Sequence, residues 1–315
     1  MPSALRGSNG YCCGCRASPA VHDVSRDGRV LISTENWQSS LFFRGPGDSA
    51  DRDLSWLDYS NIADISADGS VVVFSEVGEG PGAAIDTYLR NTNGSPAVLL
   101  GPGNMAALSP DQKWVLAVAN SPNRLELLPT GIGETKKLET AALSDFTDPG
   151  WFPDSKRVTF AGQEEGKRWR MYAQDLAGGK PVPISPEISL PGPYDNNPLS
   201  PDGKFVWARD PENKAWLYPL DGSAPRQITM TPADLWVNWG ADGRSAYVIQ
   251  VEGDVIRCYR IDLSSGDRRV VREVVTPDRV GGTGILGMKM TPNGDAYAYS
   301  HQTQLSQLYL VTGLK

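Results

Sequence analysis

An all-β fold made of a repeated unit is predicted by three observations. A ten-residue pattern recurs seven times along the 315 residues, and it is clearest in LSPDGKFVWA at 199–208. The copies are 40 to 51 residues apart, a period expected of a repeated supersecondary unit. The 33 Gly and 24 Pro are spread along the chain and no long helical periodicity is visible, which is typical of many short strands joined by turns.

Each copy is predicted to be a strand, a tight turn and a second strand. Proline presets φ at the first corner of the turn, Asp bonds nearby backbone N–H groups, and Gly accepts a positive φ. Gln112 and Ser155 replace this glycine in two copies, and each costs on the order of 1 kcal/mol if the positive φ is kept. The copies are VSRDGRVLIS from Val24, ISADGSVVVF from Ile65, LSPDQKWVLA from Leu108, WFPDSKRVTF from Trp151, LSPDGKFVWA from Leu199, WGADGRSAYV from Trp239 and MTPNGDAYAY from Met290.

A second and weaker repeat follows most copies, and it again consists of two strand-like runs around a turn that carries Gly or Asn. It is visible in DTYLRNTNGSPAVLL from Asp86, LELLPTGIGETKKL from Leu125, RMYAQDLAGGKPVPI from Arg170, AWLYPLDGSAPRQI from Ala215 and RCYRIDLSSGDRRVV from Arg257. The two repeats together give four antiparallel strands per period. This is the signature of a blade in a β-propeller.

Seven blades are the preferred number, and six or eight are left open. The last copy lacks an outer strand before the sequence stops at Lys315. An unpaired outer edge exposes backbone donors and acceptors, so we expect a strand from about residues 8–20 to complete this blade. The predicted organisation is a leader over residues 1–20, either frayed or supplying the closing strand, and a single propeller domain over residues 21–315.

The composition argues against two classes of partner. The formal net charge is −7, and the chain lacks the clustered Lys and Arg of a nucleic-acid-binding surface. No apolar run approaches the roughly 20 residues that a membrane-spanning helix needs. The N-terminal stretch also lacks the apolar centre of a secretory signal.

Several stretches resemble one known family. The runs HDVSRDGRVLIS, RDLSWLDYSNIADISADGSVVVFSE, LRNTNGSPAVLLG, WFPDSKRVTFAGQEEG and LYLVTGLK are similar to the WD-repeat-like, TolB-type propeller region found C-terminal to the catalytic domain of bacterial serine/threonine protein kinases. The resemblance covers about residues 20–315, and it implies an upstream kinase domain, a sensor or interaction role and an extracytoplasmic location. The chain carries no kinase motif of its own, so it is not a kinase as it stands.

Propeller geometry predicts where a site would lie. The Asp-Gly turns share one face, so the starts of the first strands and the ends of the second strands surround the channel on the opposite face, called here the mouth face. The side chains expected to bind a ligand there are His22, Asp23, Glu35, Trp37, Asp148, Tyr194, Asp195, Arg209 and Trp236. The only two histidines, His22 and His301, are expected in neighbouring blades.

Three functions are compatible with these residues. His22, His301 and Asp23 could bind a divalent metal ion in the central channel, because imidazole and carboxylate suit Mn, Zn or Fe. Glu76, Asp64 and His301 could instead serve as catalytic groups of a hydrolase, of the glycosidase or lactonase type, with a Trp stacking on the sugar. A small polar molecule, a glycan or a protein could also be bound without chemistry.

The same polar groups can equally well solvate the channel and bond to one another. We therefore predict a sensor or interaction module that binds at the channel mouth, with the hydrolase as the alternative. No cofactor is required by the sequence.

Overall fold

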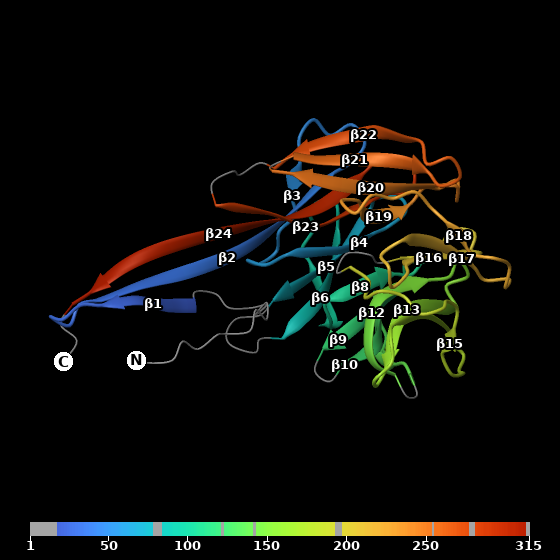
Figure 1. Cartoon of the computed structure of the whole chain (residues 1–315), viewed down its shortest axis with the longest axis horizontal. Coiled ribbons are helices and arrows are strands. Elements are labelled where there is room, and N and C mark those ends of the chain that lie inside the picture. Colours follow the sequence, from blue (N-terminus) through green and yellow to red (C-terminus); the bar gives the residue numbers. More distant parts are fainter. Residues whose placement is uncertain are drawn as a thin grey trace.

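The strands form six antiparallel sheets, which are the blades of a β-propeller (Figure 1). The computed structural model describes residues 18–77, 84–120, 123–140, 143–192, 197–253, 255–276 and 281–312, and no helix occurs among them. The all-β propeller prediction is confirmed. The six sheets of the described residues are one fewer than the preferred number and lie within the range left open.

The first five blades follow one another along the chain. Blade 1 contains β4 (Asn61–Ile65), β5 (Val71–Val77), β6 (Ile85–Asn91) and β7 (Val98–Pro102). Blade 2 contains β8 (Met105–Leu108), β9 (Trp114–Asn120), β10 (Asn123–Pro129) and β11 (Lys136–Lys137). Blade 3 contains β12 (Leu143–Trp151), β13 (Arg157–Glu164), β14 (Arg170–Asp175) and β15 (Val182–Pro183).

Blade 4 has a shortened inner edge. It contains β16 (Phe205–Arg209), β17 (Ala215–Pro219) and β18 (Arg226–Gln227), and a single bridge between Leu199 and Val206 stands where the inner strand would be. Blade 5 contains β19 (Leu235–Trp239), β20 (Ser245–Glu252), β21 (Val255–Asp262) and β22 (Arg268–Val275).

Blade 6 is built from both ends of the sequence. Its inner strands are β23 (Gly282–Met290) and β24 (Tyr297–Val311), and its outer strands are β2 (Val30–Arg44) and β3 (Arg52–Asp53). A strand from the N-terminal part of the chain therefore closes the ring, but it comes from residues 38–44 rather than 8–20. Closure needs a long strand with apolar residues, and Leu41 and Phe43 of β2 supply the buried ones.

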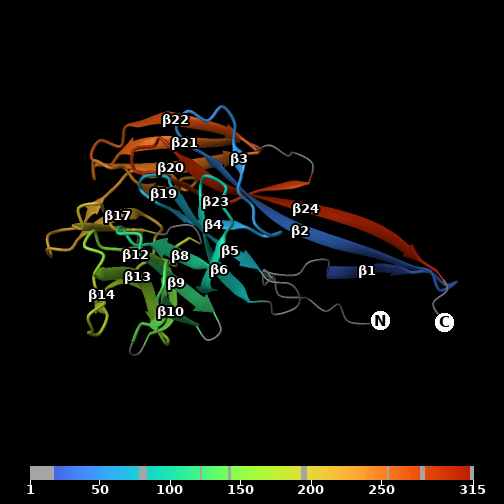
Figure 2. The same cartoon turned by 180° about the vertical axis from the view of Figure 1, so that it is seen from behind.

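A narrow arm projects from the propeller (Figures 1 and 2). β2 and β24 pair without interruption from Arg44 opposite Tyr297 to Val30 opposite Val311, and only the half nearer Arg44 belongs to blade 6. In the other half β1 (Ser18–Val24) pairs with β2, and the three strands form the arm.

The first copy of the repeat is not part of a blade. Its turn connects β1 to β2 at the far end of the arm. The placement of His22, Asp23, Glu35 and Trp37 at the channel mouth is thus wrong, because all four lie on β1 or on the arm half of β2. A hairpin turn has the same local sequence requirements in an arm as in a blade, so the pattern alone does not distinguish them.

The other turns follow the predicted chemistry. The Asp202 carboxylate accepts the backbone N–H of Lys204 at 3.1 Å and the Ser200 hydroxyl at 2.6 Å, and Asp68 binds Ser70 in the same way. Gln112 and Ser155 keep the positive φ of the glycine that they replace, at 57° and 54°. The recurring Asp therefore shapes turns.

The core consists of six clusters of buried apolar side chains among the described residues, one at each interface between neighbouring blades. Val71 and Val115 belong to the cluster between blades 1 and 2, for example, and Phe43 and Phe74 to the cluster between blades 6 and 1. The remaining interfaces are filled in the same way. Because the last cluster returns to blade 1, the ring is closed by packing as well as by strand pairing.

Ser300 joins blade 6 to blade 1 by hydrogen bonds. Its hydroxyl donates to the carbonyl of Ser60 at 3.0 Å and accepts the N–H of Ile62 at 2.7 Å, and the side chain is fully buried. Ser300→Ala should therefore lower the free energy of unfolding by about 1–3 kcal/mol, because it leaves buried backbone groups without partners. Urea denaturation measures this change.

The matched control is Ser306→Ala, on the exposed part of the same strand. This variant should unfold like the parent protein. Equal stabilities of the two variants would contradict a closing role for Ser300.

Candidate functional site

Asp64 lies at the propeller axis, where it contacts three blades. A bulge between Ile62 and Asp64 in β4 breaks the regular alternation of the strand. The Asp64 carboxylate accepts the backbone N–H groups of Ile65 and of Leu108 in blade 2, each at 2.8 Å. It also accepts the side-chain amide of Asn197, just before Leu199 in blade 4, at 2.9 Å.

The bond between Asp64 and Asn197 crosses the channel. Blades 1 and 4 are opposite one another in a ring of six, and the bond joins blade 1 to the segment that leads into blade 4. Asn197 has a positive φ of 59°, a conformation that asparagine adopts more readily than most residues, and its N–H donates to the carbonyl of Pro149 in blade 3. The axis is thus bridged by hydrogen-bonded side chains.

Lys289 and Asp148 are also buried close to this bridge. Burial raises the pKa of Asp64, and the charge of Lys289 on β23, which is 3% exposed, offsets only part of this rise. Asp148 lies in the irregular part of β12 with a φ of 53°, directly before Pro149. Asp64, Asn197 and Lys289 are called the channel cluster below. It holds a buried carboxylate, a partly buried amide and a buried ammonium group.

Sequence reasoning missed Asn197 and the clustering of these groups. One signal was available: besides Asp23 in the arm copy, three copies carry a charged or amide residue four positions before the Asp or Asn of the turn. These are Asp64 before Asp68, Asn238 before Asp242 and Lys289 before Asn293. Asn197 lies one position further from its turn, in the blade that has only a single bridge in place of an inner strand.

Glu76 positions a loop. Its carboxylate accepts the backbone N–H groups of Leu57 at 3.1 Å and Tyr59 at 3.3 Å, together with the hydroxyl of Ser60. Burial raises the pKa of Glu76, and these donors act in the opposite direction. The side chain is 2% exposed, so its oxygens face the loop between β3 and β4.

The two histidines are far apart. His22 lies beside Ile32 in the arm and bonds Ser33 at 2.7 Å, whereas His301 is buried in blade 6 opposite Ser40. Eight positions of β2 separate Ile32 from Ser40, or about 26 Å at ~3.3 Å per residue. His22, Asp23 and His301 therefore do not form one site. The described residues contain no group of three or more His, Cys, Asp or Glu side chains that could hold a metal ion.

The remaining expected residues are separated from one another. Arg209 donates to the backbone carbonyls of Asn213 and Asp234, each at 3.1 Å. Trp236 is 1% exposed and stacks on Trp207 with ring centroids 4.3 Å apart, inside the interface of blades 4 and 5. Tyr194 and Asp195 lie outside the described residues.

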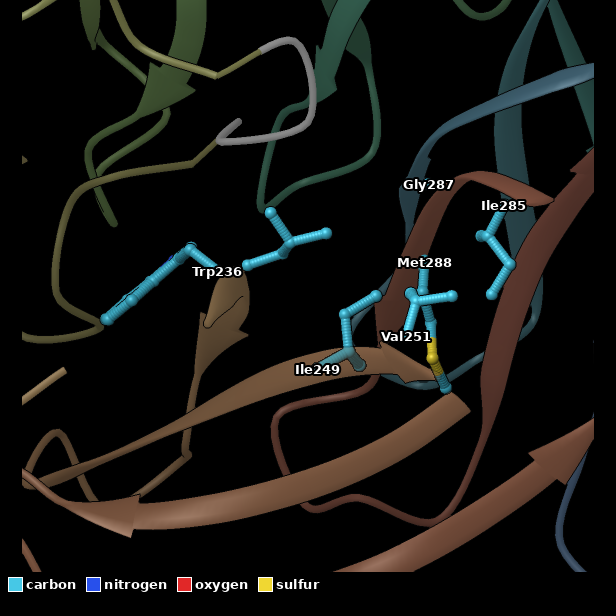
Figure 3. Close-up of a pocket in the computed structure, with 7 residues that line it drawn as sticks. Trp236, Ile249, Val251, Ile285, Gly287 and Met288 are labelled. Atoms are coloured by element: carbon cyan, nitrogen blue, oxygen red, sulfur yellow. The ribbon is translucent and has the colours of Figure 1, made fainter. Parts of the chain in front are cut away.

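A small pocket opens on the mouth face between blades 5 and 6 (Figure 3). It lies at the beginning of β19, in the middle of β23 and at the end of β20, and its cavity volume is about 10 Å³. This is room for about one water-sized group, so the hollow can receive the tip of a side chain and not a whole small molecule, whose sites usually measure about 300–1,000 Å³. The lining residues are Leu235, Trp236, Ile249, Val251, Ile285, Gly287 and Met288.

No described helix has the length and apolar character needed to cross a membrane.

Glu76→Gln should destabilise the protein by about 1–3 kcal/mol, since the amide group would face backbone N–H donors that now have an acceptor. The exposed Glu134→Gln is the control and should leave the midpoint of urea denaturation unchanged. An unchanged midpoint for Glu76→Gln as well would contradict the structural role of this carboxylate.

No protein-family model and no curated protein matches this chain. Solved structures do match. A putative TolB from Agrobacterium tumefaciens aligns with a TM-score of 0.62 and 17% identity, over 85% of this chain and 99% of the other. TolB from Acinetobacter baumannii aligns with a TM-score of 0.53 and 12% identity, over 90% of this chain and 79% of the other.

An oligogalacturonate lyase in complex with manganese aligns with a TM-score of 0.51 and 13% identity, over 89% of this chain and 77% of the other. At these identities the likeness concerns the fold and not the activity. The chain has a TolB-like β-propeller fold.

Proposed function

We propose that this chain is a protein-interaction module, whose mouth face takes an apolar side chain of a partner between blades 5 and 6. The observation that carries the proposal is the lining of the pocket, in which the only side-chain nitrogen or oxygen is Nε1 of Trp236. Leu235 and Val251 at the pocket are 43% and 39% exposed, so an apolar surface is already accessible there.

The chemistry of the pocket favours an apolar occupant over a sugar. Burying an aliphatic or aromatic side chain stabilises a complex by about 25 cal/mol per Å² of apolar surface removed from water. A sugar hydroxyl placed there would meet Nε1 of Trp236 as the single side-chain nitrogen or oxygen of the lining, and each hydroxyl left without a partner would cost about 1–3 kcal/mol. Of the three ligand classes considered from the sequence, a protein fits this surface best.

The polar groups at the axis give less support to a small polar ligand or to hydrolysis. Asp64 is 6% exposed and is bonded to three donors, and Glu76 is bonded to the loop before β4. A general acid or base has to reach the proton that it transfers. Binding at the pocket requires no rearrangement of either carboxylate.

Two features implied by the family resemblance stay predictions. An upstream kinase domain would appear as an in-frame coding sequence before Met1. An extracytoplasmic location would appear when the full-length protein is fractionated in its host.

Methyl NMR of protein labelled with ¹³C at its methionine methyl groups tests the proposed pocket. N-acetyl-leucinamide should shift the methyl signal of Met288, which lines the pocket, and not that of Met171 in the interface of blades 3 and 4. For so small a probe we expect a dissociation constant on the order of millimolar. Galacturonate should leave both signals in place.

A pair of variants controls for non-specific binding. Val251→Asp puts a charge beside the pocket and should abolish the shift, whereas Val270→Asp, on the exposed outer strand of blade 5, should preserve it. A response to galacturonate with none to N-acetyl-leucinamide would overturn the proposal and favour a polar ligand.

A further inference from the structure

The half of β24 in the arm has one edge that no described strand covers. β23 pairs with β24 only as far as Thr303, and the N–H of Gln304 makes the last contact on that side, with the carbonyl of Gly281 at 2.8 Å. Beyond it β24 runs on to Val311, and β2 is its only partner among the described strands. Figures 1 and 2 both show this part of the strand away from the propeller.

The direction of the backbone groups at this edge follows from that last contact. Backbone N–H and C=O groups alternate between the two sides of an antiparallel strand. Because the N–H of Gln304 points away from β2, the groups of Ser306, Leu308 and Leu310 also point away from β2. The pairing of β2 agrees, since the N–H of Ser39 points to the opposite side, where it donates to Asp58. The arm therefore presents a row of backbone donors and acceptors.

The two edges of the arm differ in their protection. An exposed edge is usually blunted by proline, charge or a bulge. β1 has all three: Pro19, Asp23 and a bulge between Val21 and Asp23. The stretch from Gln304 to Val311 has none of them, and it pairs with β2 without a bulge.

The same stretch is apolar and exposed. Leu308 and Leu310 are 66% and 58% exposed, and Leu305 and Tyr309 are 46% and 43% exposed. The sequence contains no Asp, Glu, Lys or Arg between Asp295 and Lys315. An uncharged apolar edge with unpaired backbone groups is suited to adding a further strand.

We propose that the arm binds a second copy of this chain, through antiparallel pairing of β24 with β24 of the other copy about a two-fold axis at Leu308. The proposal is independent of the pocket on the mouth face. The two three-stranded arms would then form one continuous sheet.

The register follows from the backbone groups. A two-fold axis at Leu308 pairs Leu308 with itself and Ser306 with Leu310, so that every outward-pointing residue between 306 and 310 is bonded. An axis at Gln307 would instead require Gln304 to bond Leu310 of the other copy, although the N–H of Gln304 is already bonded to Gly281. The axis at Leu308 bonds every outward-pointing residue from 306 to 310, and it leaves the bond between Gln304 and Gly281 in place.

The side chains are compatible with this register. Residues directly opposite one another in a sheet share a face, and like charges there are destabilising. The register puts Leu308 against Leu308 and Leu305 against Val311, and Gln307 meets Tyr309. Since the stretch carries no charge, pairing with its own copy creates no repulsion.

Light scattering and cross-linking test the proposal. The protein at tens of micromolar should have twice the mass of a 34.1 kDa chain. Leu308→Pro removes one outward N–H and should give the monomer mass, because proline is tolerated at an edge but cannot donate. Val21→Pro is the control at the β1 edge and should remain dimeric. A monomer mass for the parent protein, or an equal effect of the two prolines, would overturn the proposal.

Cysteine variants test the register itself. With Cys12, Cys13 and Cys15 changed to Ser, Leu308→Cys should be converted to a covalent dimer by a short bis-maleimide, because opposed bonded residues have Cα atoms about 5.5 Å apart. Val21→Cys is equally exposed, and the two copies of residue 21 would be about 24 Å apart across the joined sheet, so it should not cross-link. Equal cross-linking of both variants would reject pairing through β24.

The remaining thiol does not interfere with this readout, because Cys258 is fully buried. The Leu308 variants should have the same midpoint of urea denaturation as the parent protein when the two are compared at concentrations that give the same fraction of monomer. An unfolded Leu308→Pro protein would leave the cysteine pair as the deciding test.

Discussion

The pairing of β2 with β24 is the interaction on which the rest of the structure depends. It joins residues 30–44 to residues 297–311, and it brings Leu41 and Phe43 against the core between blades 6 and 1. Without it, blade 6 would lose its outer strands and the ring would have a free edge. Interfaces between the other blades are formed by sequence neighbours, so they carry much less of the entropic cost of closing a long loop.

The bridge across the axis complements this closure. Asp64 and Asn197 connect opposite blades, whereas the apolar clusters connect neighbouring ones. Burial of the carboxylate is costly, and the three donors around it offset part of that cost. The polar groups that seemed available for chemistry therefore contribute to holding the ring together, which shifts attention from the channel to the outer surfaces.

The fold could be predicted from the sequence because the turns are local. Asp202, Gln112 and Ser155 act in the structure as their positions in the repeat predict. The arm could not be predicted, because the hairpin at Asp27 satisfies the same local rules as a hairpin in a blade. Only the pairing of β2 with β24 shows that this hairpin lies outside the ring. The candidate site could not be predicted for a related reason. His22 and His301 are neighbours only in a ring of seven blades, in which the arm hairpin would be a blade. The channel cluster depends on a bulge in β4, which the alternation of polar and apolar residues does not predict.

The arm also has a mechanical consequence. Val30 and Val311 are paired at its far end, and β2 and β24 run from there into the propeller body. A pulling force applied between Ser18 and Val311 would first peel β1 from β2 and would then open the long ladder one residue pair after another. The load would reach blade 6 only after the arm had opened, so under tension the arm would extend while the propeller stayed closed.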